Sequence, residues 1–155
     1  MNAREVALKV INQVMNEGAY SNIALAKEIN RGRLSDQDRR FVTEIVYGTI
    51  KAGDTIDWII GHYVSRPLGK IPPVIRNILR MGIYQLFFLS RVPPSAACNQ
   101  AVELAKKYGH AGTVKFVNGV LRGGRRALLK KWFIRRKPAI LCAISPLSIF
   151  ILSGW

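Results

Sequence analysis

The sequence is poor in cysteine and in acidic residues. Its 155 residues include 2 cysteines and 9 Asp and Glu, against 24 Lys and Arg, which gives a formal net charge of +15. Two cysteines are too few for a small disulfide-bonded scaffold. An apolar content of 49% is too high for a disordered chain. The length indicates one ordinary globular domain with room for a tail. The scarcity of cysteine favours a reducing compartment.

Motifs that carry enzyme chemistry are also missing. The sequence has no GxGxxG, no GxxxxGK(S/T) and no GxSxG, so it predicts neither a phosphate cradle nor a nucleophile elbow. His62, His110, Cys98 and Cys142 occur singly, without the paired spacing of a metal site. We therefore predict no catalytic residue, no cofactor and no metal site in this chain.

The N-terminus lacks the long apolar core of a secretory signal, because Arg4, Glu5 and Lys9 interrupt it. This absence favours a cytoplasmic protein. The strong positive charge predicts a polyanionic partner, either a nucleic acid or an anionic membrane surface.

The charge is unevenly distributed along the chain. All 9 acidic residues occur at or before Glu103, so residues 104–155 hold 11 basic and no acidic side chains. Residues 122–137 are especially basic, with Trp132 and Phe133 among them. Such a run neutralises phosphates and gives salt-sensitive affinity without sequence choice. The alternative is a solvated tail with no specific partner.

Capping residues and helical periodicity divide residues 1–122 into about seven helices, and no strand pattern of useful length occurs. The capping signals include Asn2 with Glu5 and Ser35 with Asp38. The helices are predicted to start at Asn2, Ser21, Ser35, Asp54, Val74, Ala96 and Thr113. The most apolar one, over residues 74–89, is expected at the centre of the bundle, and the seventh is expected to end at Arg122.

Several stretches resemble a known module. They are GAYSN (18–22), LSDQDRRF (34–41), EIVYGT (44–49), RNILRMGIYQL (76–86), VPP (92–94), AVELAK (101–106) and FVNGVLR (116–122). Over about residues 3–122 the chain resembles the NusB-like N-terminal domain of the Sun/Fmu-type ribosomal RNA cytosine-5 methyltransferases. The second half also suits the NusB transcription antitermination factors, which share the fold, whereas the YSN and YGT stretches favour the methyltransferase branch.

The resemblance implies an all-α, NusB-like helical bundle that binds RNA over residues 1–122, followed by a basic, irregular tail over residues 123–155. In the family, S-adenosylmethionine and the catalytic cysteines belong to a following domain, which we do not expect in this chain. Cys98 and Cys142 match none of the family's catalytic motifs, so no catalytic role is transferred to them. The chain is therefore predicted not to be an enzyme as it stands.

The predicted RNA-binding residues are basic side chains, to which no base contact is assigned. They are Arg4, Lys9, Arg39, Arg40, Arg76, Arg80, Lys115, Arg122, Arg125 and Arg126. For some of them a structural ion pair is the competing interpretation, and Arg40, four residues before Glu44, is predicted to pair with it. Tyr84 is predicted to lie in the core, and Asn99 and Asn118 are predicted to be buried polar groups that fix helix packing.

The predicted partner is small-subunit ribosomal RNA. One alternative is an antitermination module that binds nascent RNA together with a ribosomal protein. Another is an enzyme completed by a separately encoded catalytic half.

The resemblance stops after Arg122, and the genetic code suggests a reason. Read from the third base of the Phe150 codon, allowed codons can encode His-Pro-Glu-Trp, part of the segment with which the enzymes continue. We therefore expect that a frameshift between about residues 123 and 150 truncated a longer enzyme, which the downstream gene sequence can test. Residues 138–155 are uncharged, but they are too few to span a bilayer, which takes about 20 apolar residues, and Pro146 interrupts them. No membrane association is predicted.

Overall fold

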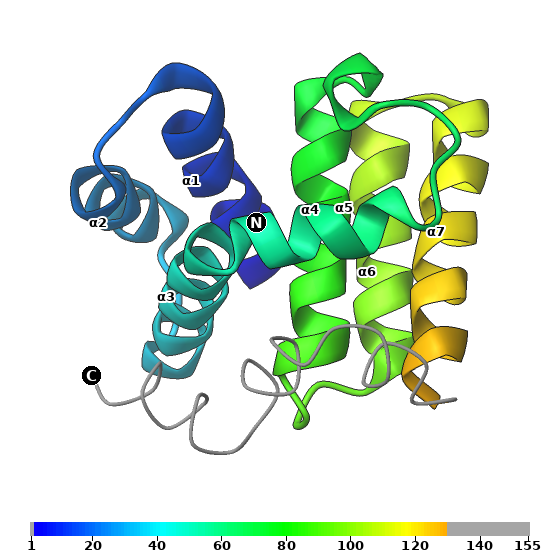
Figure 1. Cartoon of the computed structure of the whole chain (residues 1–155). Helices are drawn as coiled ribbons and strands as arrows, with labels where there is room; N and C mark the ends of the chain where they lie inside the picture. The colour runs from blue at the N-terminus through cyan, green and yellow to red at the C-terminus, as the bar shows by residue number, and fades with distance from the viewer. Residues whose placement is uncertain (1, 130–155) are drawn as a thin grey trace.

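The computed structural model describes residues 2–129, which form seven α-helices and one short 3-10 helix (Figure 1). The α-helices are α1 (Ala3–Glu17), α2 (Ser21–Gly32), α3 (Asp36–Lys51), α4 (Gly53–Gly61), α5 (Pro73–Phe88), α6 (Pro94–Tyr108) and α7 (Ala111–Leu129), and the 3-10 helix η1 spans Leu68–Lys70. No strand occurs among these residues. The predicted all-α class is confirmed, and each helix starts within two residues of its predicted position.

Local capping explains where two of the helices begin. The Asn2 side chain accepts a hydrogen bond from the backbone N–H of Glu5 at 2.9 Å, and Ser35 Oγ accepts one from the N–H of Asp38 at 3.2 Å. Each bond satisfies a backbone donor that the first helical turn leaves without a partner. Helix α1 ends at Gly18, whose φ of 72° is a conformation that glycine adopts without steric cost.

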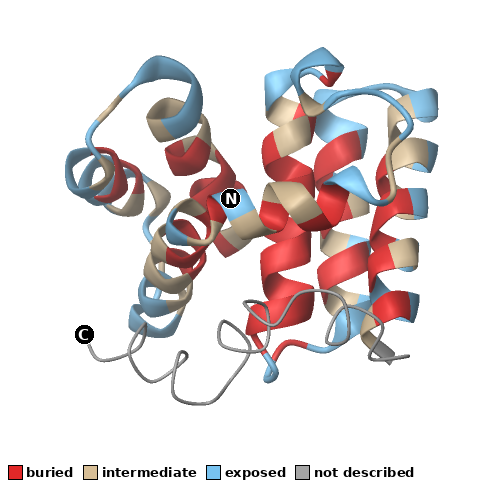
Figure 2. Ribbon diagram, viewed as in Figure 1, coloured by how far each residue is buried: buried red, intermediate tan, exposed pale blue. Residues whose placement is uncertain are grey.

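The helices form two groups joined by α4 (Figure 1). Helices α1, α2 and α3 pack together on one side, and α5, α6 and α7 pack together on the other. Helix α5 contacts every other helix except α2 at substantial interfaces and buries 13 of its 16 residues (Figure 2). The predicted central position of this helix is confirmed. One continuous apolar core runs through both groups.

A glycine on α3 lets α5 approach closely. A Cβ atom at Gly48 would overlap the phenol ring of Tyr84. Tyr84 is 3% exposed, as predicted for a core residue, and stacks on Phe88 with ring centroids 5.3 Å apart. Burial, together with the nearby charge of Glu44, raises the pKa of Tyr84 to about 12. The YGT stretch of the sequence is therefore a packing motif at this helix contact.

Helix α7 is longer than the sequence indicated, because it continues from Arg122 to Leu129. Gly123 and Gly124 lie inside the helix at tight contacts: a Cβ at Gly123 would lie 2.6 Å from Tyr63 Cδ1, and one at Gly124 would lie 3.0 Å from Ile83 Cδ1. These glycines therefore allow close packing and do not end the helix. Arg125 and Arg126 become helical residues as a result.

The rest of the predicted tail, residues 130–155 with Cys142, lies outside the described residues, and the division at residue 122 stays a prediction. Within residues 2–129, no helix combines the length and the apolar character needed to cross a membrane. The same part of the chain holds no group of three or more His, Cys, Asp or Glu side chains placed to bind a metal. Cys98 is a buried free thiol.

Candidate nucleic-acid interface

Arg80 on α5 is the most deeply buried of the ten predicted RNA-binding residues, with 8% of its surface exposed. Its guanidinium forms a two-point ion pair with Asp57 on α4: Nε donates to Oδ1 at 2.7 Å and Nη2 donates to Oδ2 at 2.9 Å. Nη1 donates to Asn77 Oδ1 at 2.9 Å, and Asn77 Nδ2 donates to Asn12 Oδ1 on α1 at 2.7 Å. Because this network joins α1, α4 and α5, we leave Arg80 out of the RNA-binding surface.

Sequence reasoning missed this network. The sequence indicates no partner for Arg80, and it predicts Asn99 and Asn118 as the buried asparagines. The structure places Asn99 at the surface and Asn118 in a half-buried position, so the prediction that Asn99 is buried is wrong. The buried asparagine is Asn77, which is fully buried. The signal that could have found it is the spacing of Asn77 and Arg80, three residues apart on a mostly apolar helix, which places the two side chains on the same face.

Arg4 also makes structural contacts. It is half-buried on α1, its Nε donates to Gln85 Oε1 on α5 at 2.7 Å, and its guanidinium lies 5.0 Å from the centroid of the Phe41 ring on α3. Burial lowers the pKa of Arg4. The side chain therefore joins three helices, and only part of it faces solvent. Lys9, further along α1, is likewise half-buried.

Arg39 and Arg40 lie at the beginning of α3, and both are exposed. Arg39 Nε donates to the carbonyl oxygen of Leu34 at 3.2 Å. The predicted pairing of Arg40 with Glu44 is wrong, because Glu44 pairs instead with Arg91 in the connection between α5 and α6. Among residues 2–129, the side chain of Arg40 has no ion pair or hydrogen bond.

Helix α7 presents four exposed basic side chains and no acidic one. Lys115, Arg122 and Arg126 share one face, because they are seven and four residues apart. With a rise of 1.5 Å per residue they span about 16 Å along the helix. None of these three, nor Arg125, forms an ion pair with the acids of the described chain.

Two acidic residues are paired with lysines near the end of α6, the helix that precedes α7 in the chain. Glu103 accepts a hydrogen bond from Lys106 Nζ at 2.8 Å, and Glu5 pairs with Lys107. The positive charges of Arg125 and Arg122 reach Cys98 on α6: they act to lower the pKa of this thiol, although burial is the larger effect and raises it. The basic charge of α7 is therefore not neutralised within the described part of the protein.

The fold separates the predicted residues into two ends of the molecule. The beginning of α3, the α5–α6 connection and the end of α7 lie at the lower end in Figure 1, and the beginnings of α5 and α7 lie at the upper end. Five exposed arginines belong to the lower elements, and we call them the lower basic end: Arg39, Arg40, Arg122, Arg125 and Arg126.

Arg76 and Lys115 belong to the upper part of α5 and α7. Arg76 is half-buried, and its Nε is buried without a hydrogen-bond partner among residues 2–129. Lys115 is exposed. The five arginines of the lower basic end therefore belong to two separate helices, α3 and α7, at one end of the molecule, whereas Arg76 and Lys115 belong to the upper parts of α5 and α7.

The described residues form an all-helical bundle around the buried helix α5, with basic and no acidic side chains on α7. These features are those of an all-α, polyanion-binding class of protein. The model of the NusB family matches residues 1–126. The chain therefore belongs to the NusB family, and the likeness noted in the sequence is confirmed.

Known proteins similar to this chain carry two kinds of name. A probable ribosomal RNA small subunit methyltransferase B from Synechocystis sp. is 41% identical over 127 residues, which cover 82% of this chain and 28% of that protein. The transcription antitermination protein NusB of Bacillus velezensis is 36% identical over 120 residues, which cover 77% of this chain and 89% of that protein. The chain thus spans little more than a quarter of the methyltransferase.

A solved structure of antitermination factors NusB and NusE in complex with double-stranded RNA contains a similar fold. The TM-score is 0.74 with 27% sequence identity, and the match covers 81% of this chain and 94% of the solved chain.

Proposed function

We propose that this chain is an RNA-binding domain of the kind that accompanies the catalytic domain of a ribosomal RNA cytosine-5 methyltransferase. The observation that carries the proposal is the lower basic end, where exposed arginines on α7 lack acidic partners in the described chain. Arginine suits this role because its planar guanidinium donates two parallel hydrogen bonds to a phosphate. The higher identity to the methyltransferase, 41% against 36% for the antitermination protein, supports the methyltransferase branch.

In this proposal the bundle positions RNA and takes no part in bond making. Phosphates are neutralised by Arg122, Arg125 and Arg126 of α7, while Arg39 and Arg40 contact a second stretch of backbone at the same end. Phosphate contacts fix orientation without reading sequence. The core network of Arg80 keeps the helices in a fixed arrangement, so the spacing of the contacts is preset. S-adenosylmethionine and the groups that transfer methyl would belong to another domain or another chain.

The test is a titration of the full chain with three RNAs of equal length: a small-subunit ribosomal RNA helix, a transcription leader and an unrelated sequence. We expect the ribosomal RNA helix to bind most tightly, with an affinity that falls steeply as salt rises, since counterions are released from each neutralised phosphate. Equal binding of all three would reduce the proposal to non-specific RNA affinity. No binding of any RNA at low salt would contradict it.

The antitermination module is the second candidate, and the solved complex of NusB with NusE and RNA favours it. It predicts that the leader RNA binds tightly only when a ribosomal protein is added. A third arm mixes the chain with a separately expressed methyltransferase domain, S-adenosylmethionine and ribosomal RNA. Methyl transfer that depends on this chain would identify it as one half of a split enzyme, and unchanged transfer would remove that idea.

A further inference from the structure

The connection between α5 and α6 carries a further arginine at the lower end, Arg91, which is not among the RNA-binding residues predicted from the sequence. Its side chain is 62% exposed, and its Nη2 donates a hydrogen bond to Oε2 of Glu44 on α3. The side chain of Glu44 is only 30% exposed. A partly buried carboxylate therefore holds one guanidinium nitrogen of Arg91, while most of the arginine side chain faces solvent.

The packing of α3 on α5 fixes the position of Glu44. Glu44 lies one turn before Gly48, the residue that admits the ring of Tyr84. Burial raises the pKa of Tyr84 to about 12, Glu44 raises it further, and Arg91 acts to lower it. The ion pair therefore lies beside the close contact of α3 with α5, where dense packing restricts the movement of the carboxylate.

Arg40 lies on one side of this ion pair. It precedes Glu44 by four residues, so the two side chains share a face of α3. With a rise of 1.5 Å per residue, the two positions are about 6 Å apart along the helix. Arg40 therefore lies close to the Glu44–Arg91 pair without bonding to its carboxylate.

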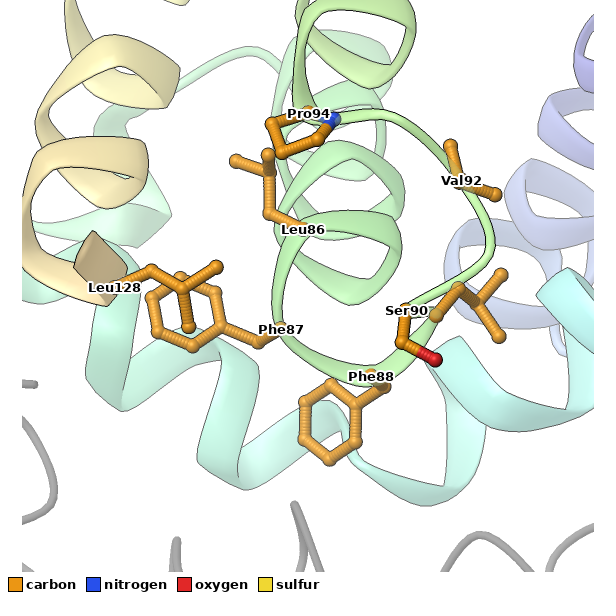
Figure 3. A pocket seen from close by; sticks show the side chains of 8 residues that line it. Leu86, Phe87, Phe88, Ser90, Val92, Pro94 and Leu128 are labelled. Atoms are coloured by element: carbon orange, nitrogen blue, oxygen red, sulfur yellow. The ribbon is translucent and has the colours of Figure 1, made fainter. Parts of the chain in front are cut away.

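The end of α7 lies on the other side of the α5–α6 connection. Ser90 and Val92, the neighbours of Arg91 in the chain, line an apolar hollow of about 250 Å³ together with Leu128 of α7 (Figure 3). Arg125 lies three residues before Leu128 and therefore on the same side of α7. The connection that carries Arg91 is thus placed between α3, which it reaches through Glu44, and the arginines at the end of α7.

We infer that Arg91 binds an RNA phosphate between the arginines of α3 and those of α7, and that Glu44 positions its guanidinium for this contact. A guanidinium has donors on more than one edge, so a carboxylate bonded to one nitrogen leaves the other nitrogens available to a phosphate. A side chain that is already held loses less rotamer freedom when it binds. Arg91 thereby joins the two groups of arginines of the lower basic end into one continuous surface for an RNA backbone.

This inference rests on the proposed function, and it makes a prediction whose sign differs from that of simple charge. If Glu44 only neutralised Arg91, its removal would make the lower end more positive and strengthen RNA binding. If Glu44 positions Arg91, its removal weakens RNA binding although the net charge rises by one. The surface pair Glu103–Lys106 on α6 supplies matched controls, because each of its residues can be substituted with the same change in charge.

The experiment titrates the small-subunit ribosomal RNA helix with variants of the full chain at several salt concentrations, after urea unfolding has shown that each variant is folded. Arg91→Gln should weaken binding about fivefold at low salt and lower the slope of log affinity against log salt by about 1. Lys106→Gln, which loses the same charge, should stay within about twofold of the parent because salt screens distant exposed charges.

Glu44→Gln should weaken binding about threefold, a modest effect because an exposed ion pair holds its partners only weakly. Glu103→Gln, with the same gain in net charge, should stay within about twofold of the parent. Since Glu44 acts through Arg91, the double variant Arg91→Gln with Glu44→Gln should bind like Arg91→Gln alone.

The remaining outcomes overturn the inference. Glu44→Gln that binds RNA as tightly as Glu103→Gln, or more tightly than the parent, shows that Glu44 does not position Arg91. A further loss of affinity in the double variant shows that Glu44 acts on RNA without Arg91. Arg91→Gln that binds like Lys106→Gln removes the phosphate contact alone, whereas a parent chain that binds no RNA overturns the proposed function and this inference with it.

Discussion

Arginines on α5 and on α7 show how the same side chain serves two purposes in one fold. Arg80 of α5 lies within reach of Asp57 and Asn77, and each of its three guanidinium nitrogens donates a hydrogen bond inside the protein. Arg125 and Arg126 of α7 are exposed on a helix without acids. The presence or absence of an acidic partner, set by tertiary packing, therefore decides whether an arginine holds the bundle together or is free for a polyanion.

The largest effect should come from breaking the α5 pair. Substituting Asp57→Ala leaves the buried guanidinium of Arg80 without its counter-charge, and we expect the free energy of unfolding to fall by about 3 kcal/mol. Asp54→Ala, an exposed position on the same helix, should change it by less than about 0.5 kcal/mol. Urea unfolding measures both variants, and equal effects would show that the Arg80 network contributes nothing particular to stability.

Part of this comparison could be predicted from the sequence and part could not. The caps at Asn2 and Ser35 are local signals, as is the apolar run of α5, so the helices and the central position of α5 were predicted correctly. The choice of partners depends on which helices meet. Nothing near Arg80 in sequence shows that α4 brings Asp57 to it, and nothing near Glu44 shows that Arg91 approaches.

The end of α7 illustrates the same limit. A pair of glycines after Arg122 commonly marks the end of a helix. Here, Gly123 and Gly124 lie inside the helix, where the absence of a side chain lets Tyr63 and Ile83 pack closely against it. The basic residues of the candidate site were predicted from charge alone. Their division into buried and exposed groups, and into two ends of the molecule, required the packed structure.

A second pair of variants compares a glycine of α3 that is packed against α5 with a glycine of α7 that has open space around it. A methyl group at Gly48 collides with Tyr84, so Gly48→Ala should lower the free energy of unfolding by about 2 kcal/mol through overpacking. Gly119 of α7 has no atom within 4 Å of an added Cβ, so Gly119→Ala should raise it by up to about 1 kcal/mol through helix propensity. Thermal unfolding gives both signs, and a stabilising Gly48→Ala would contradict the close contact.

The smallest effect on stability should come from breaking the ion pair between Glu5 of α1 and Lys107, which lies in the last turn of α6. The hydrogen bond from Lys107 lowers the pKa of Glu5 below its ordinary value of 4.5. A carboxyl with a lowered pKa in the folded state stabilises the protein above its ordinary pKa, and this contribution is lost as the pH falls through the lowered value.

The Glu5→Gln variant should therefore be less stable than the parent near neutral pH, and the difference should shrink below about pH 4.5. Glu17→Gln, at an exposed position at the end of the same helix, is the control and should show no such convergence. Unfolding measured as a function of pH tests this, and a difference that grows on acidification would contradict the assigned direction.

The central claim is that the unpaired arginines of α7 bind RNA phosphates. Its most direct test is the slope of log affinity against log salt for ribosomal RNA, measured for the parent chain, for Arg125→Gln with Arg126→Gln, and for Lys27→Gln with Lys70→Gln. Both double variants lose two exposed positive charges, but only the first loses them from the lower basic end. We expect the arginine variant to bind more weakly, with a slope reduced by about 2, and the lysine variant to keep the parent slope. Equal slopes for the two double variants would contradict the claim, because RNA would then respond to net charge and not to the arginines of α7.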